Sequence, residues 1–305
     1  MLQSTKNLKL SVIIPTYNRS KLLDFTLHSI TLQNISRESF EVIVVDDGSS
    51  DNTKEIVYSY EEVINIKYFF KKDRGYCPGS SRNIGIMNSS SPICLFVDSG
   101  LLLSNKFLSS HLSYYNSENL HEISVLGLVY GIYHKPMDEE VILKLIDCMN
   151  PTTSIQEIKR RNISPDVREN YFQNHKYNIS NLPAPWVMFM SGNVSVSRSN
   201  LIKVGMFDEN FDGNWGCEDQ ELGYRLNRLG IRLEISKDAE SLHYPHEIDV
   251  NENRKQGYHN CVYFNSKYNT EETRLFLNHY KEMTMVESID INKILLEKKK
   301  VTSRA

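Results

Sequence analysis

The 305-residue sequence has no long apolar run and no excess of basic charge. No stretch approaches the roughly 20 apolar residues that a membrane-spanning helix needs, and residues 1–7 lack the apolar core of a signal peptide. These two absences favour a cytoplasmic protein. The formal net charge of -3 leaves no general basic surface of the kind that nucleic-acid-binding proteins carry, so we expect no nucleic-acid partner.

Cysteine is scarce, and its spacing argues against two common kinds of site. The five cysteines include no CxxC pair and stand at Cys77, Cys94, Cys148, Cys217 and Cys261. Their odd number and wide spacing favour reduced thiols over a disulfide framework or a zinc site.

Glycine motifs for phosphate are also missing, because no GxGxxG follows the first expected strand and no GxxxxGK[ST] occurs anywhere. A dinucleotide-binding fold and a P-loop are therefore not expected.

Apolar runs and helical stripes alternate through the first 100 residues. The apolar runs predict strands at 8–14, 42–45, 66–70 and 93–97, with helices between them. This alternation is typical of an α/β, Rossmann-like arrangement with a mostly parallel sheet and right-handed crossovers. Polar residues end all four strands, at Thr16 to Arg19, Asp46 and Asp47, Arg74, and Asp98. Because parallel strands end at one edge, where open α/β sheets bind ligands, we expect a site there.

The run at 93–97 consists of five apolar residues and is followed by Asp98, Ser99 and Gly100. Such a run predicts a buried strand that brings Asp98 to the carboxyl edge of the sheet. Two interpretations stay open on this strand alone: Asp98 caps the following segment, or its carboxylate binds a ligand. A carboxylate at that edge can accept the N3 hydrogen of uracil or a ribose hydroxyl, or hold a divalent metal beside a diphosphate.

Beyond residue 100 the pattern is less regular. We expect a helix over 101–115, strands over 123–133 and 231–235, a strand with a glycine break over 186–196, and helices over 250–268 and from 271 onward. Residues 133–185 are the least patterned part, apart from a helix expected over 139–148, and form either a long solvated connection or an acceptor-binding loop. The lysines at 298–300 indicate either a solvated end or a peripheral contact with a membrane surface.

An acidic pair opens the helix expected from residue 218. The helix is indicated by an apolar face and a glycine stop, at Leu222, Leu226, Leu229 and Gly230. Glu218 and Asp219 then lie in the first turn, where the helix dipole favours the charged form. The pair is either ordinary helix-start electrostatics or a source of a carboxylate base. Trp215 and Gly216 favour the second interpretation, because an indole offers a flat face to a sugar and glycine lets a ligand approach the backbone.

With these stretches assembled, the chain resembles the inverting glycosyltransferases of family 2 that have the GT-A fold. The resemblance is carried by SVIIPTYNR at 11–19, VVDDGS at 44–49, SRNIG at 81–85, LFVD at 95–98, SGN at 191–193, FD at 207–208 and WGCED at 215–219. The later stretches are most similar to galactosyl- and N-acetylgalactosaminyl-transferring members and to chondroitin-polymerase-type domains. The resemblance covers residues 10–130 and 185–268.

The resemblance implies a domain organisation as well as a fold. The expected fold is a Rossmann-like, mostly parallel central sheet flanked by helices, with a helical extension at the C-terminus. Residues 1–268 would form the glycosyltransferase domain and residues 269–305 the helical tail. Within the domain, 1–100 would be the nucleotide-binding half and 101–268 the acceptor-binding and catalytic half, with 133–185 as a variable insertion.

The same resemblance implies roles for individual residues. The nucleotide and the donor sugar would be bound by Pro15, Thr16, Tyr17, Arg19, Asp47, Arg82, Asn83 and Asp98. Asp219 matches the catalytic base that deprotonates the acceptor, and Glu218 would hold hydroxyls of the acceptor or donor. Trp215, Gly216 and Asn193 would contact the acceptor or the sugar.

The resemblance also implies a divalent cation, Mn²⁺ or Mg²⁺, that neutralises the diphosphate leaving group. Asp98 occupies the first position of the family's DxD motif, and His243 matches a histidine that completes the metal site in some relatives. The third position of the motif is Gly100, which has no side-chain ligand. Three alternatives follow: Asp98 and His243 hold the metal together with phosphates and water, the site binds metal weakly, or catalysis needs no metal. We favour the first.

The sequence therefore predicts an enzyme that moves a hexose from a UDP-sugar to a hydroxyl or another nucleophile. The acceptor is a saccharide, a peptide or a small natural product, and direct displacement inverts the anomeric carbon. A non-catalytic nucleotide-sugar-binding protein is the alternative, because of Gly100. A sugar nucleotidyltransferase is disfavoured by the missing glycine-rich phosphate loop.

Overall fold

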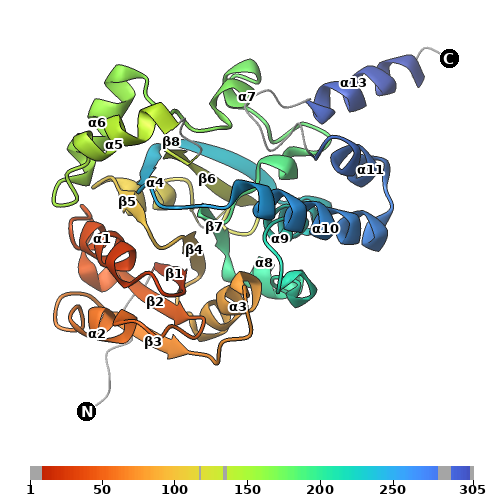
Figure 1. Cartoon of the computed structure of the whole chain (residues 1–305). Helices are drawn as coiled ribbons and strands as arrows, with labels where there is room; N and C mark the ends of the chain where they lie inside the picture. The colour runs from red at the N-terminus through yellow and green to blue at the C-terminus, as the bar shows by residue number, and fades with distance from the viewer. Residues whose placement is uncertain (1–8, 117, 133–135, 281–289, 303–305) are drawn as a thin grey trace.

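The computed structural model describes residues 9–116, 118–132, 136–280 and 290–302. Within them, one eight-stranded sheet in the order β3-β2-β1-β4-β7-β6-β8-β5 runs through the molecule, with helices on both faces (Figure 1). The strands are β1 (Leu10–Thr16), β2 (Phe40–Asp46), β3 (Ile66–Phe70), β4 (Ile93–Val97), β5 (Leu101–Leu103), β6 (Ile123–Tyr130), β7 (Asn193–Ser197) and β8 (Arg232–His243).

Short and medium helices connect these strands. The α-helices are α1 (Ser20–Thr31), α2 (Thr53–Tyr58), α3 (Pro78–Asn88), α4 (Phe107–Leu112), α5 (Pro136–Leu145), α6 (Pro151–Arg161), α7 (Glu169–Asn174), α8 (Arg198–Lys203), α9 (Glu218–Arg228), α10 (Val250–Tyr268), α11 (Glu271–Asn278) and α13 (Ile291–Thr302). In the part of the chain that the structure describes, the 3₁₀ turns are η1 (Arg37–Ser39), η2 (Pro185–Met188) and η3 (Glu209–Phe211). In the described ranges, no helix combines the length and the apolar character needed to cross a bilayer.

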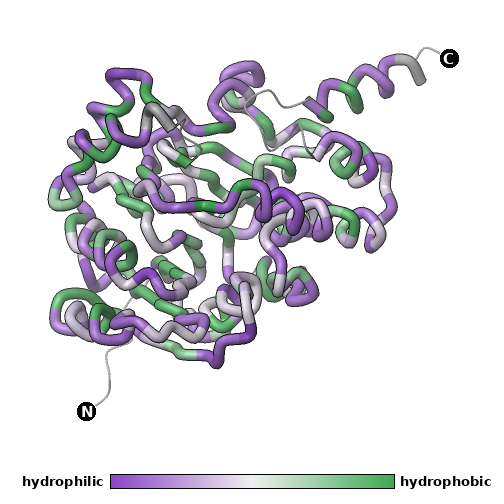
Figure 2. The backbone as a smooth tube through the Cα atoms, viewed as in Figure 1, coloured by the Kyte–Doolittle hydropathy of each residue, from purple (hydrophilic) through white to green (hydrophobic). Residues whose placement is uncertain are grey.

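The first half of the sheet confirms the predicted alternation of strands and helices. Strands β1 to β4 pair in parallel, with β1 between β2 and β4 and with β3 outside β2. Successive residues of β1 face opposite sides: Val12 packs in the core beneath α1, and Ile13 packs in the core that contains Ile86 of α3. Figure 2 shows the resulting pattern, with apolar stretches in the strands and alternating apolar and hydrophilic residues along helices such as α13.

The second half of the sheet brings further segments to the same edge. Strand β7 is antiparallel to β4, with Val97 opposite Asn193, so the residues just before β7 lie beside Asp98. Strand β8 is parallel to β6, and its last residue, His243, stands opposite Leu101 of β5. The carboxyl ends of β1, β2, β4 and β8 therefore share one edge with the start of β7, as the sequence predicts for the parallel strands.

Two predicted elements are wrong in part. The helix expected over 101–115 is present only as α4, because Gly100, with φ +101°, turns the chain so that the three leucines of β5 pair with β8. The strand expected over 186–196 is present only as β7. Pro185 starts the turn η2 instead, and the Trp186 side chain packs edge-on against Tyr224.

The segment expected to be a solvated connection or a loop, 133–185, is largely helical and packed in its described part. It contains α5, α6 and α7, and Ile155 and Phe172 are fully buried. Arg168 makes a buried ion pair with Asp166 at 2.7 Å and donates hydrogen bonds to the carbonyls of Gly127 and Met188. These contacts fix the segment on the sheet. Short helices leave little periodicity in a sequence, which explains why only the first was expected.

Candidate active site

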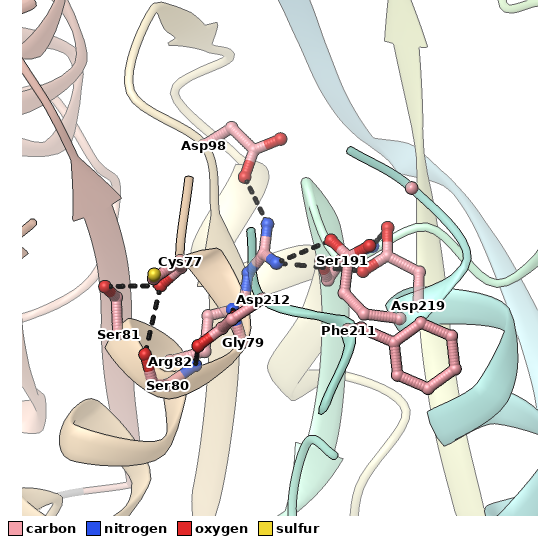
Figure 3. A network of polar contacts seen from close by, with 12 residues as sticks. Cys77, Gly79, Ser80, Ser81, Arg82, Asp98, Ser191, Phe211, Asp212 and Asp219 are labelled. Atoms are coloured by element: carbon pink, nitrogen blue, oxygen red, sulfur yellow. Dashed lines mark hydrogen bonds and ion pairs between the residues drawn. The ribbon is translucent and has the colours of Figure 1, made fainter. Parts of the chain in front are cut away.

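Arg82 lies at the centre of three carboxylates that come from separate stretches of the sequence. It stands in the first part of α3, and its side chain is only 5% exposed. Its Nη2 lies 3.0 Å from Oδ1 of Asp98, and its Nη1 lies 3.3 Å from Oε1 of Glu218 and 3.8 Å from Oδ1 of Asp219. Figure 3 shows the guanidinium between Asp98 and Asp219. The structure thus brings together four of the predicted site residues.

Burial and mutual repulsion perturb the two acids of α9. Burial raises the pKa of Glu218 well above its usual range, the neighbouring charge of Asp219 raises it further, and Arg82 opposes both effects. Burial also raises the pKa of Asp219, against the opposing effects of Arg82 and of hydrogen bonds from Ser191. One guanidinium cannot neutralise three carboxylates, so Glu218 is the member of the cluster that most readily keeps a proton near neutral pH.

Ser191 and Gly192 lie against two of the carboxylates that surround Arg82, those of Asp219 and Asp98. The Ser191 amide donates a hydrogen bond to Oδ2 of Asp219 at 3.0 Å, and the Ser191 hydroxyl donates to Oδ1. The Gly192 carbonyl accepts from the amide of Asp98 at 3.4 Å, and a Cβ at residue 192 would lie 2.8 Å from Oδ2 of Asp98. Ser191 is absent from the predicted site residues, although it belongs to the SGN stretch on which the resemblance rests.

Asn193 and Asn83 have internal roles in this structure. Asn193 is 1% exposed, and its amide nitrogen donates to the carbonyls of Leu128 and Ala239, where it fills the irregularity between β6 and β8. Asn83 exchanges hydrogen bonds with the backbone of Phe207, whose ring centroid lies 5.4 Å from the guanidinium carbon of Arg82. The expected contacts of Asn193 with the sugar and of Asn83 with the nucleotide stay predictions.

Asp47 lies at the end of β2 and has different partners from its neighbour Asp46. Lys71 lies 2.8 Å from Oδ1 of Asp47, and the Cys77 amide donates to Oδ2 at 3.0 Å. Burial raises the pKa of Asp47, and Lys71 opposes that shift. Asp46 instead accepts hydrogen bonds from the amides that follow it and from Tyr68. Lys71 was not predicted, although its place directly after β3 is the signal that identified the other strand ends.

The other predicted nucleotide residues lie at the end of β1. Pro15 and Thr16 are the last residues of the strand, and Thr16 is buried. The Tyr17 ring is 44% exposed, and its hydroxyl donates to Asp73 at 3.0 Å. Arg19 points elsewhere, because its Nη1 lies 3.1 Å from Nε2 of His246, after β8. Tyr17 and Arg19 therefore contact different segments.

Asp98 and His243 lie on neighbouring segments of the site edge. His243 is opposite Leu101, and the amide after it, that of Tyr244, donates to the Gly100 carbonyl at 2.9 Å. In the described part of the chain, no group of three or more His, Cys, Asp and Glu side chains is arranged to hold a metal ion. One carboxylate oxygen of Asp98 pairs with Arg82, and the Asp98 side chain is 47% exposed. These residues fit a divalent cation only as a partial set of ligands that phosphate oxygens would complete.

Trp215 and Gly216 lead into the acidic pair through a left-handed turn. Gly216 has φ +91° and Cys217 has φ +71°, so the chain bends sharply just before Glu218 starts α9. Glycine adopts this conformation without strain, whereas cysteine needs contacts that hold it there. The turn follows the half-buried Trp215 and leads directly into the first turn of α9, which contains Asp219.

The start of α3, which carries Arg82, has a cap from a distant residue. Asp212 accepts hydrogen bonds from the amides of Gly79 and Ser80 at 3.1 and 3.3 Å (Figure 3). A carboxylate at a helix N-terminus satisfies free amides and opposes the positive end of the helix dipole. The cap fixes the turn before Arg82. No sequence signal links residues more than 130 positions apart, so Asp212 was not predicted.

Two family models match the chain. One is described as glycosyl transferase family 2 and matches residues 11–183, and the other is described as the N-terminal domain of galactosyltransferase and matches residues 174–247. Validoxylamine A glucosyltransferase of Streptomyces hygroscopicus subsp. jinggangensis is 36% identical over 267 residues, which are 88% of this chain and 63% of that protein. Chondroitin synthase of Escherichia coli is 32% identical over 238 residues, which are 77% of this chain and 34% of that protein. The chain thus spans less than two thirds of these relatives.

Solved structures share the fold at lower identity. The mannosyltransferase PcManGT of Pyrobaculum calidifontis, in complex with GDP-Man and Mn²⁺, aligns with a TM-score of 0.62 and 15% identity, over 97% of this chain and 81% of that chain. TarS of Staphylococcus aureus, in complex with UDP-GlcNAc, aligns with a TM-score of 0.60 and 19% identity, over 85% of this chain and 66% of that chain.

Proposed function

The chain belongs to glycosyl transferase family 2, and on that basis we propose that it transfers a hexose from a UDP-sugar to an acceptor nucleophile with inversion at the anomeric carbon. The observation that carries this proposal is the convergence of Arg82, Asp98, Glu218 and Asp219 at the sheet edge that also holds Asp47. Such an edge can hold a nucleotide at one end and activate an acceptor at the other.

Asp47 and Tyr17 form the proposed uridine end. The Asp47 carboxylate, kept close to Lys71, is the group that would accept the N3 hydrogen of uracil. The exposed Tyr17 ring offers a face on which a base can stack. The complexes of TarS with UDP and with UDP-GlcNAc support a uridine nucleotide for a relative of the same fold, and we extend that choice to this chain.

Asp219 is the proposed general base. In the displacement, the acceptor oxygen forms a bond to the anomeric carbon while the bond from that carbon to the phosphate oxygen breaks. UDP leaves with the electron pair, and the acceptor proton passes to Asp219. Burial raises the pKa of Asp219 and makes it a stronger base, and the two hydrogen bonds from Ser191 keep it oriented. Glu218, which readily keeps a proton, can donate a hydrogen bond to a sugar hydroxyl.

Asp98 and His243 are the proposed protein ligands of Mn²⁺ or Mg²⁺. The metal, when bound, would neutralise charge on the departing diphosphate. Arg82 holds one oxygen of Asp98 and keeps the other free for a cation. The named relatives act with different acceptors, so we propose a saccharide or another hydroxyl-bearing small molecule as the acceptor without choosing further.

A panel of UDP-sugars tests this function by following UDP release with Mn²⁺, with Mg²⁺ and with EDTA. Validoxylamine A and chondroitin oligosaccharides serve as acceptor probes. We expect one donor to be turned over, and Asp219→Asn to lower turnover by about 1,000-fold or more while UDP affinity changes little. A non-catalytic binding protein would bind a UDP-sugar and release no UDP from any donor. Wild-type turnover by Asp219→Asn would exclude Asp219 as the base.

A further inference from the structure

Helix α10 contacts the chain immediately before the acidic pair at three consecutive positions. The Trp215 amide donates to Oε1 of Gln256 at 2.9 Å, and the Gly216 carbonyl accepts from Nδ2 of Asn260 at 2.8 Å. The Cys217 thiol donates to the carbonyl of Gly257 at 3.4 Å. Each of the three residues that lead into α9 therefore makes a hydrogen bond with α10.

Asn260 makes the largest share of these contacts. Its side chain is buried, and the residue is only 2% exposed. Besides the Gly216 carbonyl, Nδ2 lies 3.2 Å from the carbonyl of Phe211 and 3.2 Å from that of Asn214. A single amide nitrogen with two hydrogens thus serves three carbonyls of the segment 211–216, which we name the acceptor loop. Among the residues that the structure describes, no other side chain donates hydrogen bonds to all three of these carbonyls.

The loop and the helix are in direct contact. A Cβ at Gly257 would lie 3.3 Å from Cε3 of Trp215 and 1.9 Å from the Tyr280 hydroxyl, so α10 must have glycine there to lie this close. Helix α10 is itself fixed, because Phe264 packs edge-on against Trp186 and Lys267 pairs with Glu221 of α9 at 2.7 Å. A fixed helix with a buried amide is able to hold the loop in one position.

The side chains at the nucleotide end make no described hydrogen bond with Asn260. Asp47 and Lys71 directly follow β2 and β3, and their side chains bond to each other, to Cys77 and to Ser80. Asn260 bonds to none of these residues, and the acceptor loop meets α3 through Asp212, which accepts from the amides of Gly79 and Ser80.

We propose that Asn260 is a positioning residue that holds the acceptor loop, and with it Trp215 and Asp219, in the arrangement needed for transfer. Asn260 acts through the loop and touches neither the donor nor the acceptor. The inference rests on the proposed function, since it assigns Trp215 and Asp219 to the acceptor side. It assigns the positioning of the acceptor side to α10, whose Asn260 bonds to neither Asp47 nor Lys71.

The test compares Asn260→Asp and Asn260→Ala with wild type. Asn260→Asp keeps the shape but places a carboxylate oxygen against three carbonyls, whereas Asn260→Ala removes the donor without adding repulsion. Asn251→Asp makes the same chemical change at an exposed position of α10 and is the matched control. For each protein we would measure UDP affinity, UDP release without acceptor, and kcat and KM for the acceptor probes named above.

We expect Asn260→Asp to lower acceptor kcat/KM by about 10- to 100-fold, with UDP affinity within about twofold of wild type. Asn260→Ala should show a smaller loss, and Asn251→Asp none. Equal losses of UDP affinity and transfer in both Asn260 variants would mean a general folding defect and would overturn the proposal. If Asn260→Asp had wild-type UDP affinity and also wild-type kcat and KM for the acceptor, the proposal would be overturned too.

A second readout needs no acceptor. The sequence has two tryptophans, and Trp186 is fully buried while Trp215 is half-buried on the acceptor loop. Acrylamide quenching therefore reports mainly on Trp215, and we expect it to increase in Asn260→Asp but not in Asn251→Asp. Unchanged quenching would show that Asn260 does not hold the loop. If wild type released UDP from no donor, the proposed function would fail, whereas the quenching result would still decide whether Asn260 holds the loop.

Discussion

Ser191 holds the carboxylate of Asp219 with two hydrogen bonds, one from its amide at 3.0 Å and one from its hydroxyl. Both bonds favour the ionised form of Asp219 and oppose the effect of burial, which raises the pKa of this acid. The two effects together leave a carboxylate that is oriented, ionisable and more basic than one in water. Ser191 is thus as much a part of the proposed catalytic arrangement as the acid that it holds.

Ser191→Ala removes one of these two bonds and should raise the pKa of Asp219 further. The base must be ionised to act, so the acid limb of the kcat/KM profile is expected to move to higher pH, with about a 10-fold loss of activity near neutral pH. Measurement of kcat/KM against pH checks this. Ser191→Thr, which keeps the hydroxyl, serves as the control. An acid limb at the wild-type position would mean that the hydroxyl bond does not tune Asp219.

Glu218→Gln should change the pH dependence of stability in a defined direction. Burial raises the pKa of Glu218 in the folded state, so the folded protein keeps a proton that the unfolded chain releases above about 4.5. The contribution of Glu218 to the free energy of unfolding of wild type is therefore lost as pH rises from about 4.5 towards the raised folded-state pKa. Glu218→Gln cannot ionise and should gain in Tm relative to wild type between about pH 5 and about pH 8. Glu38→Gln, at an exposed position, should show no such trend. A Tm difference that shrinks as pH rises would contradict the assignment.

Asp47→Asn and Asp46→Asn form a matched pair of neighbouring substitutions. Asp47→Asn replaces an acceptor by an amide, so we expect UDP affinity to fall by about 10-fold or more with little change in Tm. Asp46 accepts bonds from Gly48, Ser49 and Tyr68, so Asp46→Asn should instead lower stability by about 1 to 2 kcal/mol. Titration of UDP and thermal unfolding distinguish the two. Equal UDP affinity in Asp47→Asn and wild type would remove Asp47 from the uridine end.

His243→Ala and Asp98→Asn test the proposed metal ligands. We expect EDTA to abolish UDP release and Mn²⁺ to restore it, and each substitution to raise the Mn²⁺ concentration needed for half-maximal activity by about 10-fold or more. His259→Ala, at an exposed position of α10, is the control. Activity that survives EDTA in wild type would mean that Arg82 and the other residues of the site suffice without a metal.

Residues at strand ends were predictable because their position follows from local pattern. An apolar run closed by Asp98, or by Asp47, already places a carboxylate at the sheet edge, and the structure confirms the strands that carry them. Their partners were not predictable in the same way. Ser191 is 28 residues from Asp219, and Asp212 is more than 130 from Gly79, so only the folded chain brings each pair together.

Two asparagines of the motif stretches also have internal hydrogen bonds that the sequence did not predict. Asn83 and Asn193 lie inside stretches that carry the resemblance, yet both use their amides to join backbone segments in the interior. A buried amide must satisfy its hydrogen-bonding groups, and a motif can therefore keep an asparagine for the fold alone. Arg82, next to Asn83 on α3, extends into the acidic cluster instead.

The buried pair of Asp166 and Arg168 has a consequence for the order of folding. These charges lose water only when the Val129 amide and the carbonyls of Gly127 and Met188 are in place to receive them. We therefore expect the segment that carries α6 and α7 to dock after β6 and η2 have formed, whereas β1 and β2 are joined by α1 and the short turn η1 alone. Pulse-labelled hydrogen exchange during refolding should accordingly protect the amides of β1 before that of Val129, and simultaneous protection would exclude this sequence of events.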